Sequence, residues 1–474
     1  MQHSLISEEL QQPLFLLLLP KLDAYALGCL ASSCRSMRQL VNSAPPSIWT
    51  AAAAAILPQP LVTCSSKHQA QALLMRYKTA CRNLRTGTTV GLAQFVDYDG
   101  AEPKYSPCGS MFARLALGSD STDCYRVQIF RVASDTVTEV LLPAAPAFIW
   151  QEVAWSPDGG SIFIVGMHSS GADHHVLLQT VDPVTLQATC CKEFAIPFAA
   201  AHCSAQLQIS EGSQFLVCCV WCTEGGQQHN GHLQVFDLKS GSICLSDELS
   251  TFHKHRKPLL TRLPGSGHVM LAAFSAGSAA GKSVLKVWNL SNAKSVRLQA
   301  CQGYQGPAAE IRGTCVRFDD SEGRGGFFST SLPGSGRLAH IGSKHQCHFI
   351  GGNTYVSLAP NGTKALKSVR AAQMPTSIAI CCTSDGRMLC SLKQADKLVH
   401  NLERFAWSPD CNFVAACQKT SLLVFSADSG SQLMAMQIAG WSQGLVWAPD
   451  MTTLVVQAYR STFKGTVEIL KLAD

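Results

Sequence analysis

One segment of the chain is spelled like a phosphate-binding loop. Residues 276–283 read Ala-Gly-Ser-Ala-Ala-Gly-Lys-Ser, which places Lys282 and Ser283 where such a loop contacts phosphate and magnesium. This chemistry needs a strand before the loop and a helix after it, because the amides of the helix N-terminus face the phosphate. Residues 269–274 suit a strand, but residues 283–290 read as a second strand. We therefore interpret 276–283 as a loop between two strands and expect no bound nucleotide.

Short groups of His and Cys residues could each supply two metal ligands. A structural zinc site takes four ligands, normally as two pairs with defined spacing, and none of these groups has a partner pair in the local sequence. The groups are His345, Cys347 and His348; Cys219 and Cys222; and His253 and His255. The chain also lacks the Gly-x-Ser-x-Gly elbow of many hydrolases. We expect no metal, no cofactor and no enzymatic activity.

Composition restricts the class of protein. The chain has 474 residues, of which 46% are apolar and only 15% charged, enough apolar material for a large core and too much for a disordered or fibrous chain. Its 38 basic residues exceed its 32 acidic residues by only six. A nucleic-acid-binding protein concentrates more Lys and Arg on one surface. We expect neither a nucleic-acid partner nor a membrane partner, since no apolar run approaches the length of about 20 residues that spans a bilayer.

The 21 cysteines are scattered and odd in number, and many lie inside apolar runs. Three adjacent pairs, Cys190-Cys191, Cys218-Cys219 and Cys381-Cys382, would point to opposite faces if they lie on strands. This pattern is typical of buried free thiols in a reducing compartment. The apolar run Leu14–Leu19 is short and follows Glu8 and Glu9, which does not fit a signal peptide. We expect a cytoplasmic or nuclear location.

Beyond residue 88 one turn signature recurs at intervals of about 40 to 54 residues, the period of propeller repeats. It is clear at five places, Tyr105–Gly109, Trp155–Gly159, Leu358–Gly362, Trp407–Asp410 and Trp447–Asp450. Degenerate versions lie at 210–212, 264–265 and 319–325. Each repeat offers four short strands with the turn between the first and the second. The pattern predicts a mainly β fold, a β-propeller of eight blades, with seven possible. A β-sandwich or a solenoid is the alternative.

The two ends of this region suggest how the ring closes. The chain ends on what reads as the third strand of its repeat, Val467–Leu472, so the last blade lacks a fourth strand. An unassigned strand, Thr89–Phe95, precedes the first turn. Pairing it beside the last blade would close the ring and remove its open edges.

The residues before 88 read as helices and predict a separate head. Residues 10–19 suit a helix that is apolar nearly all round, and Ser66–Arg85 suits a longer helix that stops at Gly87. We assign residues 8–57 to a small all-α domain, 58–87 to a helical linker and 88–474 to the propeller. A short segment that is apolar on every face must be covered, so a partner protein is the economical explanation. The alternative is a helical cap that packs only on the propeller.

Residues 8–57 resemble the F-box motif in order and spacing, through Leu22-Asp23, Ala26-Leu27, Leu30, Ser33–Arg38, Leu40 and Trp49. The motif usually opens with Leu-Pro, where this chain has Leu10-Gln11, and Met37 stands where Trp or Phe is common. Residues 77–87 look like the segment that joins F-box to propeller in the F-box/WD-repeat family. The propeller resembles WD repeats more loosely, with the repeat's Asp kept at Asp237.

This resemblance implies a substrate receptor of an SCF-type cullin–RING ubiquitin ligase, which carries no catalytic residue of its own. The F-box would bind the adaptor, and through it the cullin and RING subunits, while the propeller binds a protein substrate. The alternative is a propeller scaffold without ligase function. The implied adaptor-binding residues are Leu10, Leu14, Phe15, Leu18, Leu22, Leu27, Leu30, Arg35, Met37, Leu40 and Trp49.

The substrate face is expected where loops between second and third strands meet the links between blades. The expected loops are 118–125, 167–175, 222–231 and 275–283, together with the link 251–258. The candidate substrate-binding residues are His174, His175, His253, Lys254, His255, Arg256, Lys257, Lys282, Arg460 and Lys464. Arg and Lys side chains pair with phosphate, so this sector would favour an acidic or phosphorylated substrate. The alternative is a set of solvated loops.

Overall fold

A computed structural model provides the structure. It describes residues 67–97, 103–117, 125–142, 148–156, 158–170, 173–196, 203–209, 215–222, 229–238, 240, 242–252, 259–263, 268–275, 282–289, 294–299, 308–312, 315–319, 325–330, 338–341, 356–369, 377–382, 387–392, 402–418, 420–461 and 464–473. The F-box-like segment and all the implied adaptor-binding residues lie outside these ranges, as does the proposed boundary near residue 58. In the described part, no helix is both long and apolar enough to cross a bilayer.

The linker helix predicted at Ser66–Arg85 is found as α5, Lys67–Thr86. Its end is fixed by a glycine, as expected: Gly87 has a φ of +68°. The Gly87 amide donates to the Leu84 carbonyl at 3.2 Å and the Thr88 amide to the Asn83 carbonyl at 2.8 Å, the two bonds of a Schellman motif. A Cβ at Gly87 would lie 2.9 Å from the Leu433 carbonyl oxygen, so the tight turn and the close approach both require glycine.

The rest of the described chain is β-strand, gathered mostly into four-stranded antiparallel sheets. The first sheet contains β2 (Lys104–Tyr105), β3 (Met111–Leu117), β4 (Tyr125–Arg131) and β5 (Thr136–Leu141). The second contains β6 (Phe148–Trp155), β7 (Ile162–Ser170), β8 (Asp173–Val181) and β9 (Ala188–Ile196). The next four strands are β10 (Cys203–Ile209), β11 (Phe215–Cys222), β12 (His229–Asp237) and β13 (Ile243–Phe252). They are followed by β14 (Leu259–Leu263), β15 (His268–Ser275), β16 (Lys282–Asn289) and β17 (Lys294–Gln299).

A single residue pair, Phe252 with Ser275, joins β13 to β15, so β10–β13 and β14–β17 are two four-stranded units bridged at one point. The next sheet contains β18 (Ala308–Arg312), β19 (Cys315–Asp319), β20 (Gly325–Thr330) and β21 (Leu338–Ile341). It is followed by β22 (Val356–Leu358), β23 (Lys364–Val369), β24 (Ser377–Cys382) and β25 (Met388–Ser391). The last complete repeat contains β26 (Leu402–Trp407), β27 (Phe413–Gln418), β28 (Ser421–Ser426) and β29 (Gln432–Gln437).

The final sheet joins the two ends of the β region. It contains β30 (Trp441–Trp447), β31 (Thr453–Ser461), β32 (Lys464–Lys471) and, as its outer strand, β1 (Gly91–Asp97). β1 and β32 are antiparallel over their length, from Gly91 opposite Lys471 to Asp97 opposite Gly465. The predicted closure is therefore confirmed.

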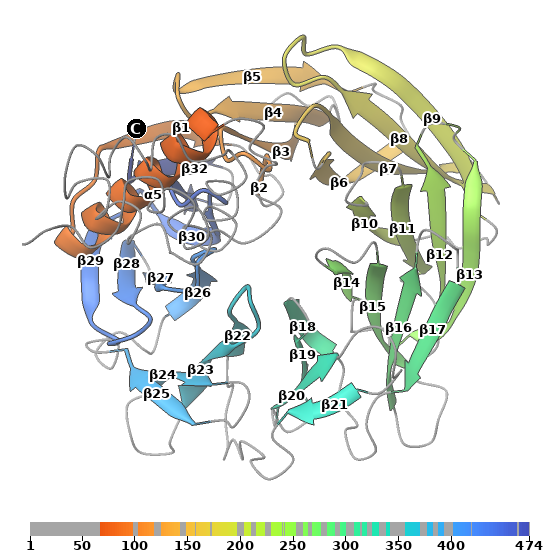
Figure 1. The fold of residues 1–474 in the computed structure, drawn as a ribbon. Coiled ribbons are helices and arrows are strands. Elements are labelled where there is room, and N and C mark those ends of the chain that lie inside the picture. Colours follow the sequence, from red (N-terminus) through yellow and green to blue (C-terminus); the bar gives the residue numbers. More distant parts are fainter. Residues whose placement is uncertain are drawn as a thin grey trace, which may run out of the picture.

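The sheets stand around a common centre with their first strands innermost (Figure 1). First strands of successive sheets contact one another from β6 through β10, β14, β18, β22 and β26 to β30. This is the architecture of a β-propeller, as the recurring turn predicted. Inner strands such as β27 and β28 are buried on both faces because each sheet packs against two neighbours, whereas the outer strands β5 and β29 are mostly exposed or half-buried.

The apolar core is divided among the gaps between neighbouring sheets. One cluster joins β3 and β4 to Trp150, Trp155 and other residues of β6–β8. Another joins β23 and β24 to β26–β28. At the closing seam Phe112 and Phe130 stack with ring centroids 4.3 Å apart and pack against Val455, Val467 and Ile469 of the final sheet. The ring is thus closed both by strand pairing and by apolar packing.

Two expectations were wrong in detail. Residues 319–325, expected as a turn between first and second strands, join β19 to β20, the second and third strands. Residues 167–175, expected as a loop, are mostly paired strand, with His168 opposite His175 and Ser170 opposite Asp173. The polar side chains of this segment suggested a loop. Near the tip of a hairpin, however, polar residues can continue the backbone pairing of the two strands as well as apolar residues do.

Candidate interaction surfaces

The recurring turn positions an aromatic side chain that ties each sheet to the one before it. The indole N–H of Trp155 donates to the Lys104 carbonyl at 2.8 Å. Trp407 donates in the same way to the Ser357 carbonyl at 3.2 Å. In both pairs the accepting residue lies in the first strand of the neighbouring sheet. It directly precedes the residue that opens that sheet's own turn, Tyr105 or Leu358. The Trp of the signature is therefore a contact between sheets, which explains why it recurs at the same place.

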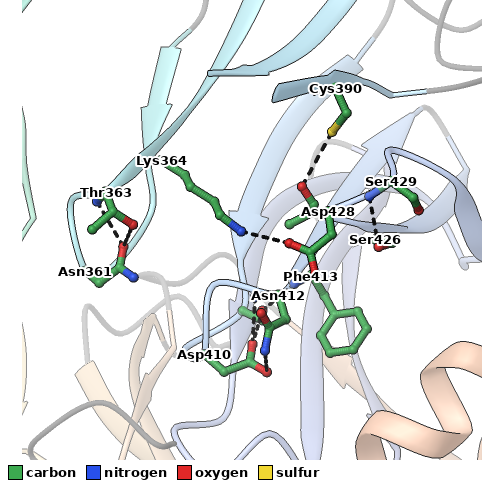
Figure 2. Close-up of polar contacts among 12 residues, drawn as sticks. Asn361, Thr363, Lys364, Cys390, Asp410, Asn412, Phe413, Ser426, Asp428 and Ser429 are labelled. Carbon is green, nitrogen blue, oxygen red and sulfur yellow. Dashed lines mark hydrogen bonds and ion pairs between the residues drawn. The ribbon is translucent and has the colours of Figure 1, made fainter. Parts of the chain in front are cut away.

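The polar residues of the turn hold its backbone. In the turn Trp407–Asp410, the Ser408 hydroxyl donates to Asp410 Oδ1 at 2.5 Å and accepts from the Phe413 amide at 2.8 Å. Asp410 also accepts from Asn412, through its amide at 3.1 Å and its side-chain nitrogen at 2.9 Å (Figure 2). The carboxylate is needed because it accepts several hydrogen bonds at once.

Cys108 replaces the carboxylate in the first of these turns. Its Sγ lies 2.9 Å from the Ser110 hydroxyl and 3.4 Å from that of Ser106. Burial raises the pKa of the Cys108 thiol, but the hydrogen bonds from Ser106 and Ser110 outweigh it, so the pKa lies below its ordinary value. The thiol thus occupies the place that Asp158 has in the next sheet, where Ser156 and the Gly160 amide donate to the carboxylate.

Figure 2 also shows a contact between neighbouring sheets at this end of the ring. Lys364, at the start of β23, donates to Asp428 Oδ1 at 3.0 Å, in the turn between β28 and β29. Cys390 in β25 donates to the Ala427 carbonyl at 3.5 Å. The turn end of the ring is therefore held by side chains that reach from one sheet to the next.

Helix α5 is docked on the turns of the last two sheets. The Tyr77 hydroxyl donates to Asp410 Oδ2 at 2.8 Å. Asn83 donates to the Leu472 carbonyl at 2.8 Å, and Arg76 lies 3.9 Å from Asp450 Oδ2. Burial and the nearby Asp410 carboxylate raise the pKa of Tyr77, so this hydroxyl stays a donor.

An apolar cluster fixes the same helix. One side of α5 joins residues of β27–β32 in the largest core cluster of the described chain, and Figure 1 shows α5 lying across these sheets. The buried helix residues are Ala70, Leu73, Leu74, Ala80, Cys81 and Leu84. Helix α5 is therefore fastened to the ring, at the end that carries the recurring turns.

The expected substrate face lies at the other end of the strands. His174 and His175 lie in β8, Lys282 begins β16, Arg460 is in β31 and Lys464 begins β32. All five sit beside hairpins between second and third strands, so they share one end of the ring, as expected. Only the His175 side chain is described: its Nδ1 lies 3.1 Å from Glu193 Oε1.

The other candidates on this face are not placed. His253, Lys254, His255, Arg256 and Lys257 lie outside the described residues, as does the metal-like group at 345–348. Within the described ranges there is no group of three or more His, Cys, Asp or Glu side chains suited to a metal ion. At the phosphate-loop-like segment, β15 comes before and β16 after, so a strand stands where such a loop needs a helix.

The described cysteines are free thiols. Cys218 and Cys219, adjacent on β11, are both fully buried, and burial raises the pKa of Cys218 to about 12. Cys381 is buried, its neighbour Cys382 is half-buried and Cys244 is exposed. The expected buried thiols are found in the inner strands, whereas some other described cysteines are half-buried or exposed.

Sequence reasoning missed the docking contacts of α5. The Asp of the recurring turn gave part of the signal, because a carboxylate repeated at one end of the ring offers an acceptor to a helix that crosses that end. A second signal was that Lys67–Thr86 contains five Lys or Arg residues and no Asp or Glu.

Comparison with known proteins gives no close relative. No protein-family model matches the chain, and no curated protein matches it. Among solved structures, one described as the crystal structure of the eukaryotic initiation factor is 13% identical, with a TM-score of 0.48, covering 77% of this chain and 82% of that chain. The structure of U3-55K is 12% identical, with a TM-score of 0.42, covering 80% of this chain and 98% of that chain.

Proposed function

We propose that this chain is a β-propeller interaction scaffold that holds two different proteins at opposite ends of one ring. The observation that carries the proposal is the docking of α5, fixed by Tyr77 on Asp410 and by Asn83 on Leu472. A helix held by hydrogen bonds and a core cluster gives the segment before it a fixed point of attachment to the ring. A partner of that segment would therefore be tethered at the turn end of the ring, while a second partner binds the hairpin end.

We infer eight blades, counting β10–β13 and β14–β17 as separate units because one residue pair alone bridges them. The proposal includes no catalytic residue and no cofactor, since a scaffold acts by bringing its partners together. The protein substrate would be acidic or phosphorylated, captured at the hairpin end near Arg460 and Lys464. The proposed location is the cytoplasm or nucleus.

A more specific function rests on the F-box resemblance of residues 8–57. On this proposal the head binds the adaptor of an SCF-type ubiquitin ligase and the propeller presents a substrate for ubiquitination. Affinity purification of the full chain, with cullin activation blocked and unblocked, tests it. Recovery of adaptor and cullin supports the ligase receptor. Recovery of propeller partners with neither of them supports the scaffold and rules out the ligase.

A further inference from the structure

The solvent-facing side of α5 carries charge of one sign. The helix Lys67–Thr86 contains Lys67, Arg76, Lys78, Arg82 and Arg85 and no Asp or Glu. One of the five, Arg76, is 44% exposed but lies 3.9 Å from Asp450 Oδ2 of the ring, on another side of the helix. The other described basic side chains, Lys78, Arg82 and Arg85, are exposed.

These three residues form a stripe with Met75. At 3.6 residues per turn, positions 75, 78, 82 and 85 fall within an arc of about 80° along one flank of the helix. With a rise of 1.5 Å per residue, the three basic residues span about 10 Å. Met75 is 64% exposed, at the N-terminal end of the stripe. An exposed thioether in line with three cations combines apolar and electrostatic contact in one narrow surface.

The stripe is held rigidly in place. Tyr77 and Cys81 alternate with the stripe residues in the sequence but face the ring. The Tyr77 hydroxyl donates a hydrogen bond to Asp410. The Schellman motif at Gly87 fixes the helix end directly after Arg85. A partner that binds the stripe therefore does not have to order the helix, and that entropic cost of binding is avoided.

We propose that Met75, Lys78, Arg82 and Arg85 form a docking stripe for an acidic protein segment that carries an apolar side chain. Carboxylates of the segment pair with the cations, and its apolar side chain covers Met75. This inference goes beyond the scaffold function, because it places a further partner on α5 itself, at the end of the ring opposite the hairpin end.

The composition of the stripe favours a protein over a nucleic acid. Binding to nucleic acid draws its affinity from the number of phosphates neutralised, and proteins that bind well contact about 6 to 10 of them. Three cations over about 10 Å fall well short of that number. An exposed Met adds nothing to phosphate contact. A membrane surface is disfavoured because the apolar side of α5 is already buried against the ring.

Fluorescence anisotropy on the full chain tests the proposal. The probe is a short labelled peptide of repeating Leu-Glu-Glu units, compared with the same peptide carrying Gln for Glu and with an oligodeoxythymidine of equal charge. The triple variant Lys78→Glu, Arg82→Glu, Arg85→Glu should weaken binding of the acidic peptide by about tenfold or more. Met75→Ser should weaken it by a smaller factor without changing its salt dependence. The milder triple variant Lys78→Gln, Arg82→Gln, Arg85→Gln keeps helix propensity. It should weaken peptide binding less than the triple Glu variant and more than Met75→Ser.

The peptide affinities are compared in the background Lys254→Glu, Arg256→Glu, Lys257→Glu, because the proposed substrate face would also bind an acidic peptide. The matched control in that background is Arg387→Glu, set against Arg82→Glu. Arg387 is an exposed basic residue directly before β25, so its reversal changes net charge by the same amount outside the stripe and should leave peptide affinity within about twofold. Equal loss in the Arg82→Glu and Arg387→Glu variants, tighter binding of the oligonucleotide, or equal binding of the Gln peptide would each overturn the proposal. None of these results depends on whether the head binds an adaptor, so failure here and failure of the scaffold proposal are distinguishable.

Discussion

The indole nitrogen of Trp447 donates a hydrogen bond to the Ala406 carbonyl at 3.1 Å, across the gap between β30 and β26. The same strand begins with Trp441, whose side chain is 64% exposed. Two Trp residues six positions apart therefore have opposite environments, one joining two sheets and one facing solvent.

This contrast gives a stability prediction with its own control. Trp447→Phe keeps an aromatic ring but leaves the Ala406 carbonyl without its donor, which should cost about 1–3 kcal/mol of unfolding free energy. Trp441→Phe removes an exposed indole and should change stability by about 0.5 kcal/mol or less. Thermal and urea unfolding of both variants provide the measurement. Equal losses would mean that the contact between the sheets contributes nothing specific.

Closure of the ring by β1 gives a second prediction. Deleting residues 467–474 removes most of β32, so β1 loses the strand it pairs with and β31 becomes an open edge. We expect a protein that is insoluble or melts at a much lower temperature. Removing Asp474 alone is the control, since it ends the chain just beyond the described strand and should melt like the full chain. A truncated protein with an unchanged melting temperature would contradict the closure.

Much of this fold could be predicted because its signals are local. The Ser-Pro-Asp turn fixes its own backbone through Ser408 and Asp410, so its position between two strands is visible in the sequence. The degenerate turn at 319–325 contains Asp and Ser but not in the order Ser-Pro-Asp, and turn chemistry alone does not say which pair of strands it joins. The contact of Tyr77 with Asp410 spans 333 residues, and no local pattern specifies such a pair. The shared end of the substrate candidates could be predicted, because every hairpin between second and third strands lies at the same end of the ring. Their side-chain partners, such as Glu193 for His175, depend on the register between strands and could not be predicted.

Asp450 gives a prediction about pH. Its carboxylate is 1% exposed, and burial raises its pKa above 3.8, although Thr452 and Arg76 act in the opposite direction. The folded state thus binds the proton more tightly than the unfolded state. The resulting stabilisation is fully present below the unfolded pKa and is lost as pH rises through the folded pKa. We expect Asp450→Asn to raise the melting temperature at neutral pH, with the advantage shrinking as pH is lowered.

Asp182 is the control of opposite sign. The amides of Thr185 and Val184 donate to its exposed carboxylate and lower its pKa. Its contribution is present above the unfolded pKa and is lost as pH falls through the folded pKa. Asp182→Asn should therefore lower the melting temperature at neutral pH and have less effect in acid. If both variants show the same pH trend, burial is not what distinguishes Asp450.

The proposed substrate face is tested by reversing charge in the link 251–258. The triple variant Lys254→Glu, Arg256→Glu, Lys257→Glu should weaken capture of an acidic or phosphorylated substrate, because Lys and Arg supply charge-assisted hydrogen bonds to phosphate and carboxylate. Binding of the head's partner should be unchanged. Quantitative co-purification of both partners from the same sample provides the measurement. Unchanged substrate recovery would mean that these residues are solvated surface.

The last prediction concerns the head. If residues 8–57 bind a ligase adaptor, binding depends on their apolar side chains, and burying one Leu at an interface is worth about 1.5–3 kcal/mol. A charge in its place would be desolvated without a partner, which costs more. The double change Leu27→Asp and Leu30→Asp should therefore abolish co-purification of the adaptor.

The propeller supplies the internal control for this variant. Its strands and the docking contacts of α5 begin at residue 67 and do not include Leu27 or Leu30. The double variant should keep the melting temperature of the ring and still capture substrate, which it would then protect from turnover. Loss of adaptor together with loss of substrate would indicate a misfolded protein, and Leu27→Ala alone then separates the two effects. If the unaltered chain binds no adaptor paralogue, the ligase proposal fails, and substrate capture by the ring remains as the test of the scaffold.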